Sequence, residues 1–397
     1  MARDLLAAEH ADLLQVALDL TARLGVARDR LVPSGNVTYQ QHSEFGGRVW
    51  SMHLYLQGAL QLLDHDLYLP ALAALRSALE HYVQDHLLFL GDRYKATAQY
   101  SEETFSEWRE AINERREGFE GVLDIRRVDR DRVEVVRSGP HFTGQGQGPG
   151  APGLSIYYSI IVDRYDPFTG GKTAQPFIGQ WPHSEDAHHR WAAQAADTWA
   201  RFLSWPVLKA NLSLNEFYTD RELARFEVHY SFLSAFTHPT VRGVAVVHGR
   251  SDPTRLAYDH YVSELILLYV ATLAALELEV FEEMTHREPQ VGLAGWEPVR
   301  EDIDRGRAAS AHLWFPTGVP HQFDRVQEAN RRGQAPDGRL LAMSERPKPE
   351  DLADEEIRYY ANPLRRLIEL HGHQNEMTGF SYVSTWPRSD SASRRFD

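Results

Sequence analysis

The feature that most constrains this fold is one long helical segment whose middle is almost entirely apolar. Residues 265–276 read LILLYVATLAAL, and Glu264 and Glu277 stand at either end of them. Twelve residues are too few to cross a membrane, which needs roughly 20. They lie within a helix predicted over about 254–286, which follows an Asp-Pro pair typical of a helix start. We therefore expect a core helix.

Apolar side chains recur at three- and four-residue spacing in several further segments, which predicts amphipathic helices. These segments cover about 3–24, 44–63, 68–90, 101–117, 185–204 and 220–237, with shorter helical pieces at about 322–332, 350–360 and 364–371. Residues 118–182 instead favour strands. VLDIRRV and RVEVVR predict a hairpin, and LSIYYSIIVDRY (154–165) has the β-branched and aromatic residues of a strand. Between them, the Gly- and Pro-rich residues 138–153 predict a mobile loop.

These patterns predict a mainly α protein: a helical bundle with a small antiparallel β insertion and an irregular C-terminal region. Neither helical half alone has enough faces to enclose the apolar stripes, so we expect both to form one bundle. The expected divisions are 1–117 for the first part of the bundle, 118–182 for the β insertion, 183–286 for the second part, and 287–397 for a C-terminal extension with short helices.

Composition excludes several classes of protein. With 56 acidic and 42 basic residues, the net charge of −14 makes a nucleic-acid partner unlikely. The chain has no cysteine, which excludes disulfides and thiolate metal sites. Its first residues, MARDLLAAEH, lack the pattern of a secretory signal, so we expect a cytoplasmic protein with no membrane contact. Only four basic residues are lysines, a bias typical of GC-rich bacterial genomes.

Two segments resemble uncharacterised bacterial HEPN-like helical proteins. They are LYLPALAALRSALEHYVQDHLLFL (67–90) and FEVHYSFLSAFTHPTVRG (226–243), which pair an Arg-x-x-x-Glu helix with a later Tyr-x-x-x-Ser-x-x-x-His-Pro helix end. The matching positions are Arg76, Glu80, Tyr230, Ser234 and His238. The resemblance implies that these residues meet inside a bundle, and it implies either a ribonuclease or an interaction protein of a defence or toxin system.

Several helices carry titratable residues on their apolar faces. His10, His53 and His86 each lie in the apolar stripe of a different helix, and Glu264 interrupts the longest apolar run. Buried groups of this kind must pair, titrate or line a wet cavity. His260 and Glu264, four residues apart, predict an imidazole oriented by a carboxylate, which suits general acid–base chemistry. For each histidine alone, a hydrogen bond to a backbone carbonyl is the simpler interpretation.

These residues lead to an enzyme hypothesis. We expect acid–base chemistry on a polar or anionic small molecule, without a cofactor, in specialised bacterial metabolism. A homodimer or a partner protein is possible. The expected catalytic residues are His260, Glu264, His238 and His81, and the expected substrate-binding residues are Arg76, Glu80, Tyr230, Ser234, His53 and His86.

The sequence also contains candidate residues for an anion site and for a metal site. Arg76, Glu80, Ser234 and His238 are expected to come together at one end of a cavity, either as an anion clamp or as a structural network. No bound metal is expected. The alternative, a His/carboxylate metal enzyme, would draw its ligands from HSEDAHH, namely His183, Glu185 and His188.

Overall fold

The computed structural model describes residues 2–33, 39–99, 102–116, 122–128, 130, 132–138, 204–237, 252–287, 291–293, 300–316, 319–358, 362–378, 384 and 386. They are mainly α-helical, as the sequence predicts. They fall into two compact units, the first combining Met1–Tyr82 with Asp220–Asp397 and the second consisting of Val83–Thr219. The divisions expected from the sequence stay a prediction.

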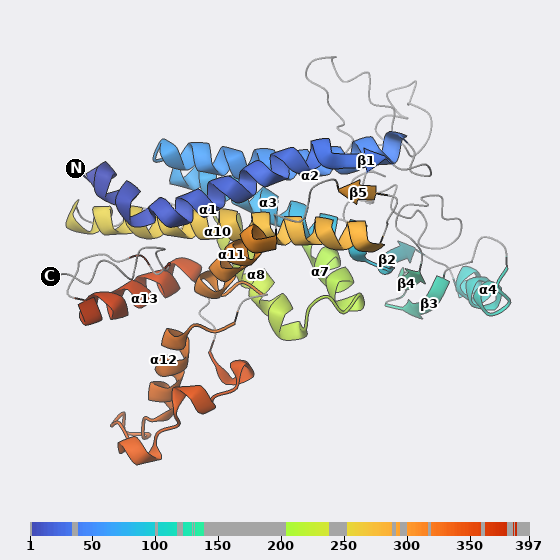
Figure 1. The fold of residues 1–397 in the computed structure, drawn as a ribbon. Coiled ribbons are helices and arrows are strands. Elements are labelled where there is room, and N and C mark those ends of the chain that lie inside the picture. Colours follow the sequence, from blue (N-terminus) through green and yellow to red (C-terminus); the bar gives the residue numbers. More distant parts are fainter. Residues whose placement is uncertain are drawn as a thin grey trace. The chain divides into compact units, whose positions relative to one another are not determined.

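Helix α10 (Asp252–Arg287) forms the core of the first unit. Every side chain from residue 261 to residue 278 is buried, which confirms the core helix expected from the apolar run. Helices α1 (Ala2–Arg30), α2 (Tyr39–Asp64) and α11 (Arg300–Leu313) pack against it (Figure 1). A helix buried on all sides needs no polar face, which explains why α10 has no clear apolar stripe.

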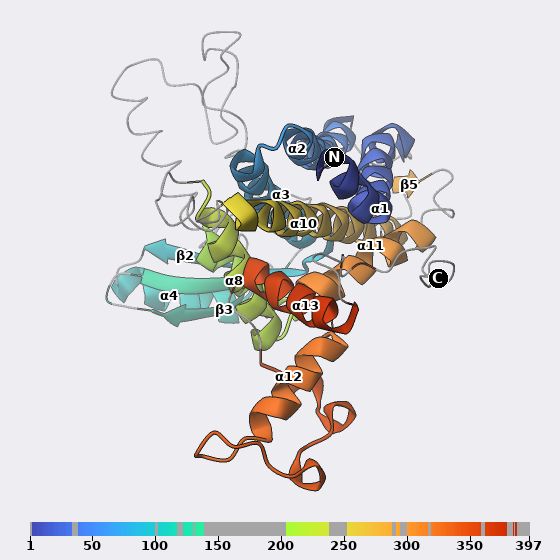
Figure 2. The same ribbon diagram turned by 90° about the vertical axis from the view of Figure 1, so that its left-hand side faces the viewer.

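The remaining elements of the first unit surround this core. They are the first part of α3 (Tyr68–Leu90), α8 (Asp220–Ser234), α12 (Gln322–Arg332), α13 (Pro363–Thr378), and the antiparallel pair β1 (Leu31–Pro33) and β5 (Val291–Leu293). Helix α13 packs against α10 and α11 (Figure 2). Three single 3-10 turns, Met343–Glu345, Pro349–Asp351 and Asp354–Glu356, follow α12, and the last two lie where the sequence predicted a helix over about 350–360. Helix α11 was not expected, because its sequence REDIDRGRAASAHL is mostly polar.

The second unit contains a three-stranded antiparallel sheet. The predicted hairpin is present as β3 (Val122–Arg127) and β4 (Arg132–Ser138). The edge strand β2 (Arg93–Gln99), which the sequence analysis missed, pairs with the other side of β4, so the order is β2-β4-β3. Helix α4 (Glu102–Asn113) packs against β3, and Phe105, Val122 and Val133 form their shared core.

Two asparagines connect the β2 strand to helix α7 (Trp205–Leu214), another element that was not expected. The Asn211 Oδ1 accepts a hydrogen bond from the Lys95 backbone N–H at 2.6 Å. The Asn215 Oδ1 accepts from the backbone N–H groups of Asp92 and Arg93, both at 2.9 Å. At the beginning of β2, these side-chain amides provide the hydrogen-bond partners that a neighbouring strand would otherwise provide.

Three sequence predictions fall outside the described residues: the loop at 138–153, the strand at 154–165 and the helix at about 185–204. Among the helices that the structure describes, none combines the length and apolar character needed to cross a membrane.

Candidate functional site

Arg76 and Glu80 lie one turn apart on α3 and connect it to α8. Nη1 and Nη2 of Arg76 donate hydrogen bonds to the two carboxylate oxygens of Glu80 at 3.0 and 2.9 Å. On α8, the Ser234 Oγ accepts from Arg76 Nε at 3.1 Å, and the Tyr230 hydroxyl accepts from Nη2 at 2.7 Å. Four of the side chains that the sequence grouped together are therefore in contact. His238, the fifth, lies outside the described residues.

This network leaves the Arg76 guanidinium few donors for a ligand. Its hydrogen bonds to Glu80, Tyr230 and Ser234 use four of its five N–H groups. The guanidinium also lies over the Tyr230 ring, 5.0 Å from the ring centroid. Burial raises the pKa of Glu80, although the charge of Arg76 opposes that shift. The arrangement matches a structural connection between two helices better than an open anion clamp.

Three of the predicted site histidines, His53, His81 and His86, contact backbone or aromatic groups of neighbouring segments. The Nδ1–H of His53 donates to a backbone carbonyl oxygen of α1 at 2.7 Å. The Nε2 of His81 bonds to the Arg48 carbonyl oxygen at 3.0 Å. In the second unit, His86 stacks on Phe217 with ring centroids 4.3 Å apart. His53 and His81 thus follow the simpler interpretation, in which a core histidine satisfies a backbone carbonyl.

His260 is partly exposed and lies next to His10, with ring centroids 5.7 Å apart. Burial lowers the pKa of His260 to about 4; the charges of His10 and His371 lower it further, and Glu264 opposes them. The ring is therefore neutral at pH 7 and offers one nitrogen as a hydrogen-bond acceptor.

The Glu264 carboxylate, for which the sequence predicted His260 as partner, binds two residues from the C-terminal region. His371 Nε2 lies 2.6 Å from Glu264 Oε2, and the Ser384 hydroxyl donates to Oε1 at 3.0 Å. The side chains of Glu264 and His371 are both 0% exposed. A carboxylate in this position accepts from Nε2–H, which fixes the orientation of the imidazole and its tautomer.

The order of these three groups differs from that of a nucleophilic triad. In a triad the histidine lies between the serine and the carboxylate and takes the proton from the serine. Here the Glu264 carboxylate lies between Ser384 and His371, and each binds a different oxygen. The geometry therefore suits proton transfer by His371 and does not activate Ser384 as a nucleophile.

Further buried polar side chains continue from Glu264 onto α11, α12 and α13. Arg366 Nη2 donates to Asp324 Oδ2 at 2.6 Å, and the two side chains are 1% and 0% exposed. Burial lowers the pKa of His312 to about 3; His321 and Arg366 lower it further, and Glu264 raises it. We call Glu264, His371, His312, Arg366 and Asp324 the buried polar row.

A neutral histidine from α8 lies near one end of the buried polar row. The Tyr269 hydroxyl donates to Nδ1 of His229 at 2.7 Å, and the opposite nitrogen, Nε2, faces the Trp314 carbonyl oxygen at 3.4 Å. Burial lowers the pKa of His229 to about 3, and the charge of Arg366 contributes to that shift. His229 is therefore a neutral ring with its proton on Nε2.

The buried polar row is costly for stability. Each buried ionisable group loses hydration, and well-packed apolar residues of similar volume usually stabilise a core at least as well as a buried ion pair. Two acids, two histidines and one arginine in one core are therefore better explained by function than by stability.

The comparisons with known proteins identify no family. The chain matches no protein-family model, no curated protein sequence and no solved structure. The HEPN-like resemblance of residues 67–90 and 226–243 accordingly stays a prediction, and function is inferred from the geometry of the buried polar row.

A metal site receives no support from the residues that the structure describes. Within them, no group of three or more His, Asp or Glu side chains is arranged to hold a metal ion. The predicted metal ligands His183, Glu185 and His188 lie outside the described residues, so the metal-enzyme alternative stays a prediction.

His371 was not expected from the sequence, although a pattern could have revealed it. Leu364, Leu367 and Leu370 form an apolar stripe along α13, and His371 lies one turn after Leu367. This is the same pattern of a histidine on an apolar face that singled out His53. Ser384 has no comparable pattern around it.

Proposed function

We propose that this protein is an acid–base enzyme that acts on a polar small molecule. The main support is the fully buried pair of His371 and Glu264, in which Nε2 of the histidine lies 2.6 Å from Oε2 of the glutamate. An imidazole held by a carboxylate is a general base whose protonated form is stabilised by the neighbouring negative charge. His371 would take up the proton at Nδ1, and Glu264 would stabilise the resulting imidazolium.

His260 supports this proposal because it lies close enough to both members of the pair for their charges to shift its pKa. It lies one turn before Glu264 on α10, is partly exposed, and is neutral at pH 7 because burial lowers its pKa to about 4. A neutral, partly exposed imidazole beside the pair would accept a hydrogen bond from a hydroxyl or amine of the substrate. His260 and Glu264, both expected to be catalytic, would then bind the substrate and orient the base, respectively.

The test is proton exchange, because an enzyme whose base takes a proton from carbon exchanges substrate C–H protons with solvent, and one that transforms its substrate in another way changes the substrate's mass. The protein would be incubated in D₂O with a mixture of small metabolites, and mass spectrometry would detect those that gain deuterium or change mass. Glu264→Gln keeps the side-chain shape but removes the negative charge, and should reduce the exchange at least about 100-fold. Glu110→Gln is the matched control, since it makes the same change at an exposed carboxylate on α4. Equal exchange in the wild type and Glu264→Gln would refute the assignment.

A ribonuclease or interaction protein is the second candidate, and the Arg76 network favours it. Arg76, Tyr230 and Ser234 are joined by hydrogen bonds, and these are positions on which the HEPN-like resemblance rests. Incubation with total RNA, compared with an Arg76→Ala plus His81→Ala variant, tests this activity. The net charge of −14 and the engaged Arg76 guanidinium rank this candidate below the acid–base enzyme.

A further inference from the structure

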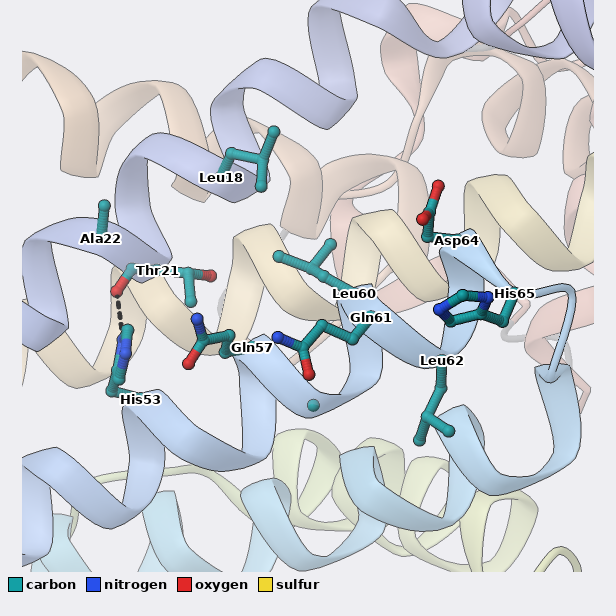
Figure 3. A pocket seen from close by; sticks show the side chains of 11 residues that line it. Leu18, Thr21, Ala22, His53, Gln57, Leu60, Gln61, Leu62, Asp64 and His65 are labelled. Atoms are coloured by element: carbon teal, nitrogen blue, oxygen red, sulfur yellow. Dashed lines mark hydrogen bonds between the residues drawn. The ribbon is translucent and has the colours of Figure 1, made fainter.

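A groove of about 780 Å³ lies between α1 and α2 in the first unit (Figure 3). Its volume falls within the range of small-molecule sites, roughly 300–1,000 Å³. The side chains that matter for recognition come from both helices: Leu18, Thr21 and Ala22 from α1, and His53, Gln57 and Gln61 from α2. None of them belongs to the buried polar row.

One ridge of α2 presents hydrogen-bonding groups to this groove. His53, Gln57 and Gln61 follow at four-residue intervals and therefore share a face of the helix, and His65 lines the groove from the turn that follows it. The two glutamines are exposed, and each amide offers a donor and an acceptor. Across the groove, Leu18 is 44% exposed and offers an apolar surface. The groove thus pairs an apolar wall with a polar wall.

His53 is fixed in one orientation at an end of this ridge. Its Nδ1–H donates to the Thr21 carbonyl oxygen at 2.7 Å, as Figure 3 shows. The ring stacks on Trp50 with centroids 4.9 Å apart, and it packs so closely on Gly25 that a Cβ there would lie 2.9 Å from the imidazole Cε1. Because Nδ1 carries the proton, Nε2 has a lone pair and acts as an acceptor.

The charges around the groove indicate what kind of molecule fits. Asp64 is the only residue with a fixed charge among the described side chains that line it. A negative charge at the groove, together with the net charge of −14, disfavours an anion. The His53 Nε2 acceptor favours a ligand that donates an N–H hydrogen bond, the glutamine amide oxygens can accept another, and Leu18 and Leu60 favour an apolar body.

We propose that the groove between α1 and α2 binds a small molecule that has an apolar body and an amine or amide N–H group. The N–H group donates to His53 Nε2 or to a glutamine amide oxygen, and the apolar body lies against Leu18. This binding site does not depend on the acid–base activity, because no residue is shared between the two.

Three probes with the same phenyl ring separate the ligand classes. Benzylamine and benzamide carry an N–H donor, whereas benzoate carries a negative charge. Saturation-transfer NMR and titration measure their binding to the full chain. We expect benzylamine and benzamide to bind with a dissociation constant on the order of 1 mM, as befits ligands of this size, and benzoate to bind at least about 10-fold more weakly.

A matched pair of glycine substitutions tests the location. Gly58 lines the groove, and a Cβ there would meet no atom within 4 Å, so Gly58→Leu fills the groove without a clash. Gly47 on the same helix has equally open space but does not line the groove, and Gly47→Leu is the control. Both changes favour helix, so both variants should fold.

We expect Gly58→Leu to weaken the binding of benzylamine and benzamide at least about 10-fold and Gly47→Leu to leave it unchanged. Three results would each overturn the proposal. They are no detectable binding of either N–H probe to the wild type, binding that Gly58→Leu does not alter, and binding of benzoate that equals that of benzamide.

Discussion

Gly306 on α11 lies so close to α10 that a Cβ atom at Gly306 would stand 2.7 Å from the Cβ of Ala275. The carbonyl oxygen of Ala271, at 3.1 Å, and the side chain of Leu20 on α1 crowd the same point. Three helices of the first unit therefore meet at a position that accommodates only glycine. The hydrogen atom at this position sets how closely α11 approaches the core helix.

Gly306→Ala should destabilise the protein. We expect the free energy of unfolding to fall by about 1–3 kcal/mol, because a methyl group overpacks this contact. This is the net loss, left after alanine gains roughly 1 kcal/mol over glycine in helix propensity, because backbone and side-chain atoms of two helices crowd the position. Urea unfolding followed by circular dichroism measures it. Gly47→Ala, in open space on α2, should instead keep or raise stability; if the two variants behave alike, the close packing at Gly306 is wrong.

The buried ion pair of Arg366 and Asp324 should show strong coupling. Removing one partner leaves the other as a buried charge, so Arg366→Met or Asp324→Asn alone should lower the free energy of unfolding by about 3–5 kcal/mol. The double variant should lose much less than the sum of the two. A double-mutant cycle in urea measures this coupling. Additive losses would show that the two side chains do not interact.

Stability should fall below neutral pH because of the buried neutral histidines. Burial lowers the pKa of His229 and His312 to about 3, whereas the unfolded values lie near 6.5. Between these values the unfolded chain binds protons that the folded chain does not. The stability that these two neutral histidines contribute is therefore fully present above about pH 6.5. It is lost as the pH falls towards 3, by up to about 1.4 kcal/mol per pH unit for each histidine.

His312→Gln isolates one of these contributions. The slope of the unfolding free energy against pH, measured by urea titration between pH 4 and pH 7, should correspond to about one proton fewer than in the wild type. An unchanged slope would mean that His312 is not held neutral in the folded protein.

Asn215→Ala should loosen the beginning of β2. The change removes the acceptor for the backbone N–H groups of Asp92 and Arg93 and should destabilise this region by about 1–2 kcal/mol. Hydrogen–deuterium exchange, read by NMR, should speed up at these two amides and much less at the β3–β4 hairpin. Unchanged exchange at residues 92 and 93 would contradict the role given to Asn215.

Local patterns predicted the helices better than the edge strand. The apolar stripe and the Gly91-Asp92 pair that follows it predicted α3 with its observed bounds. The spacing of apolar residues predicted α12 equally well. The β2 strand was missed because RYKATAQ is only weakly apolar. Its strand conformation depends on pairing with β4 and on amides from α7, and such long-range partners leave no local pattern.

The same limit applies to the candidate site. Sequence spacing predicted that Arg76 and Glu80 would pair, since they are four residues apart on one helix. It also suggested His260 as the partner of Glu264, but the carboxylate binds His371 and Ser384, both more than 100 residues away. Which of several histidines on apolar faces reaches a given carboxylate depends on how the helices pack, and spacing does not contain that information.

The contact between Glu264 and His371 also affects the order in which the protein assembles during synthesis. His371 follows Glu264 by 107 residues, so at 5–20 residues per second the ribosome adds it roughly 5–20 s later. Enclosing Glu264 before His371 exists would place a carboxylate in an apolar core, which costs several kcal/mol. That cost is avoided if the helix that becomes the most deeply buried stays open to water around Glu264 until His371 is made, and the last described helix then completes its burial.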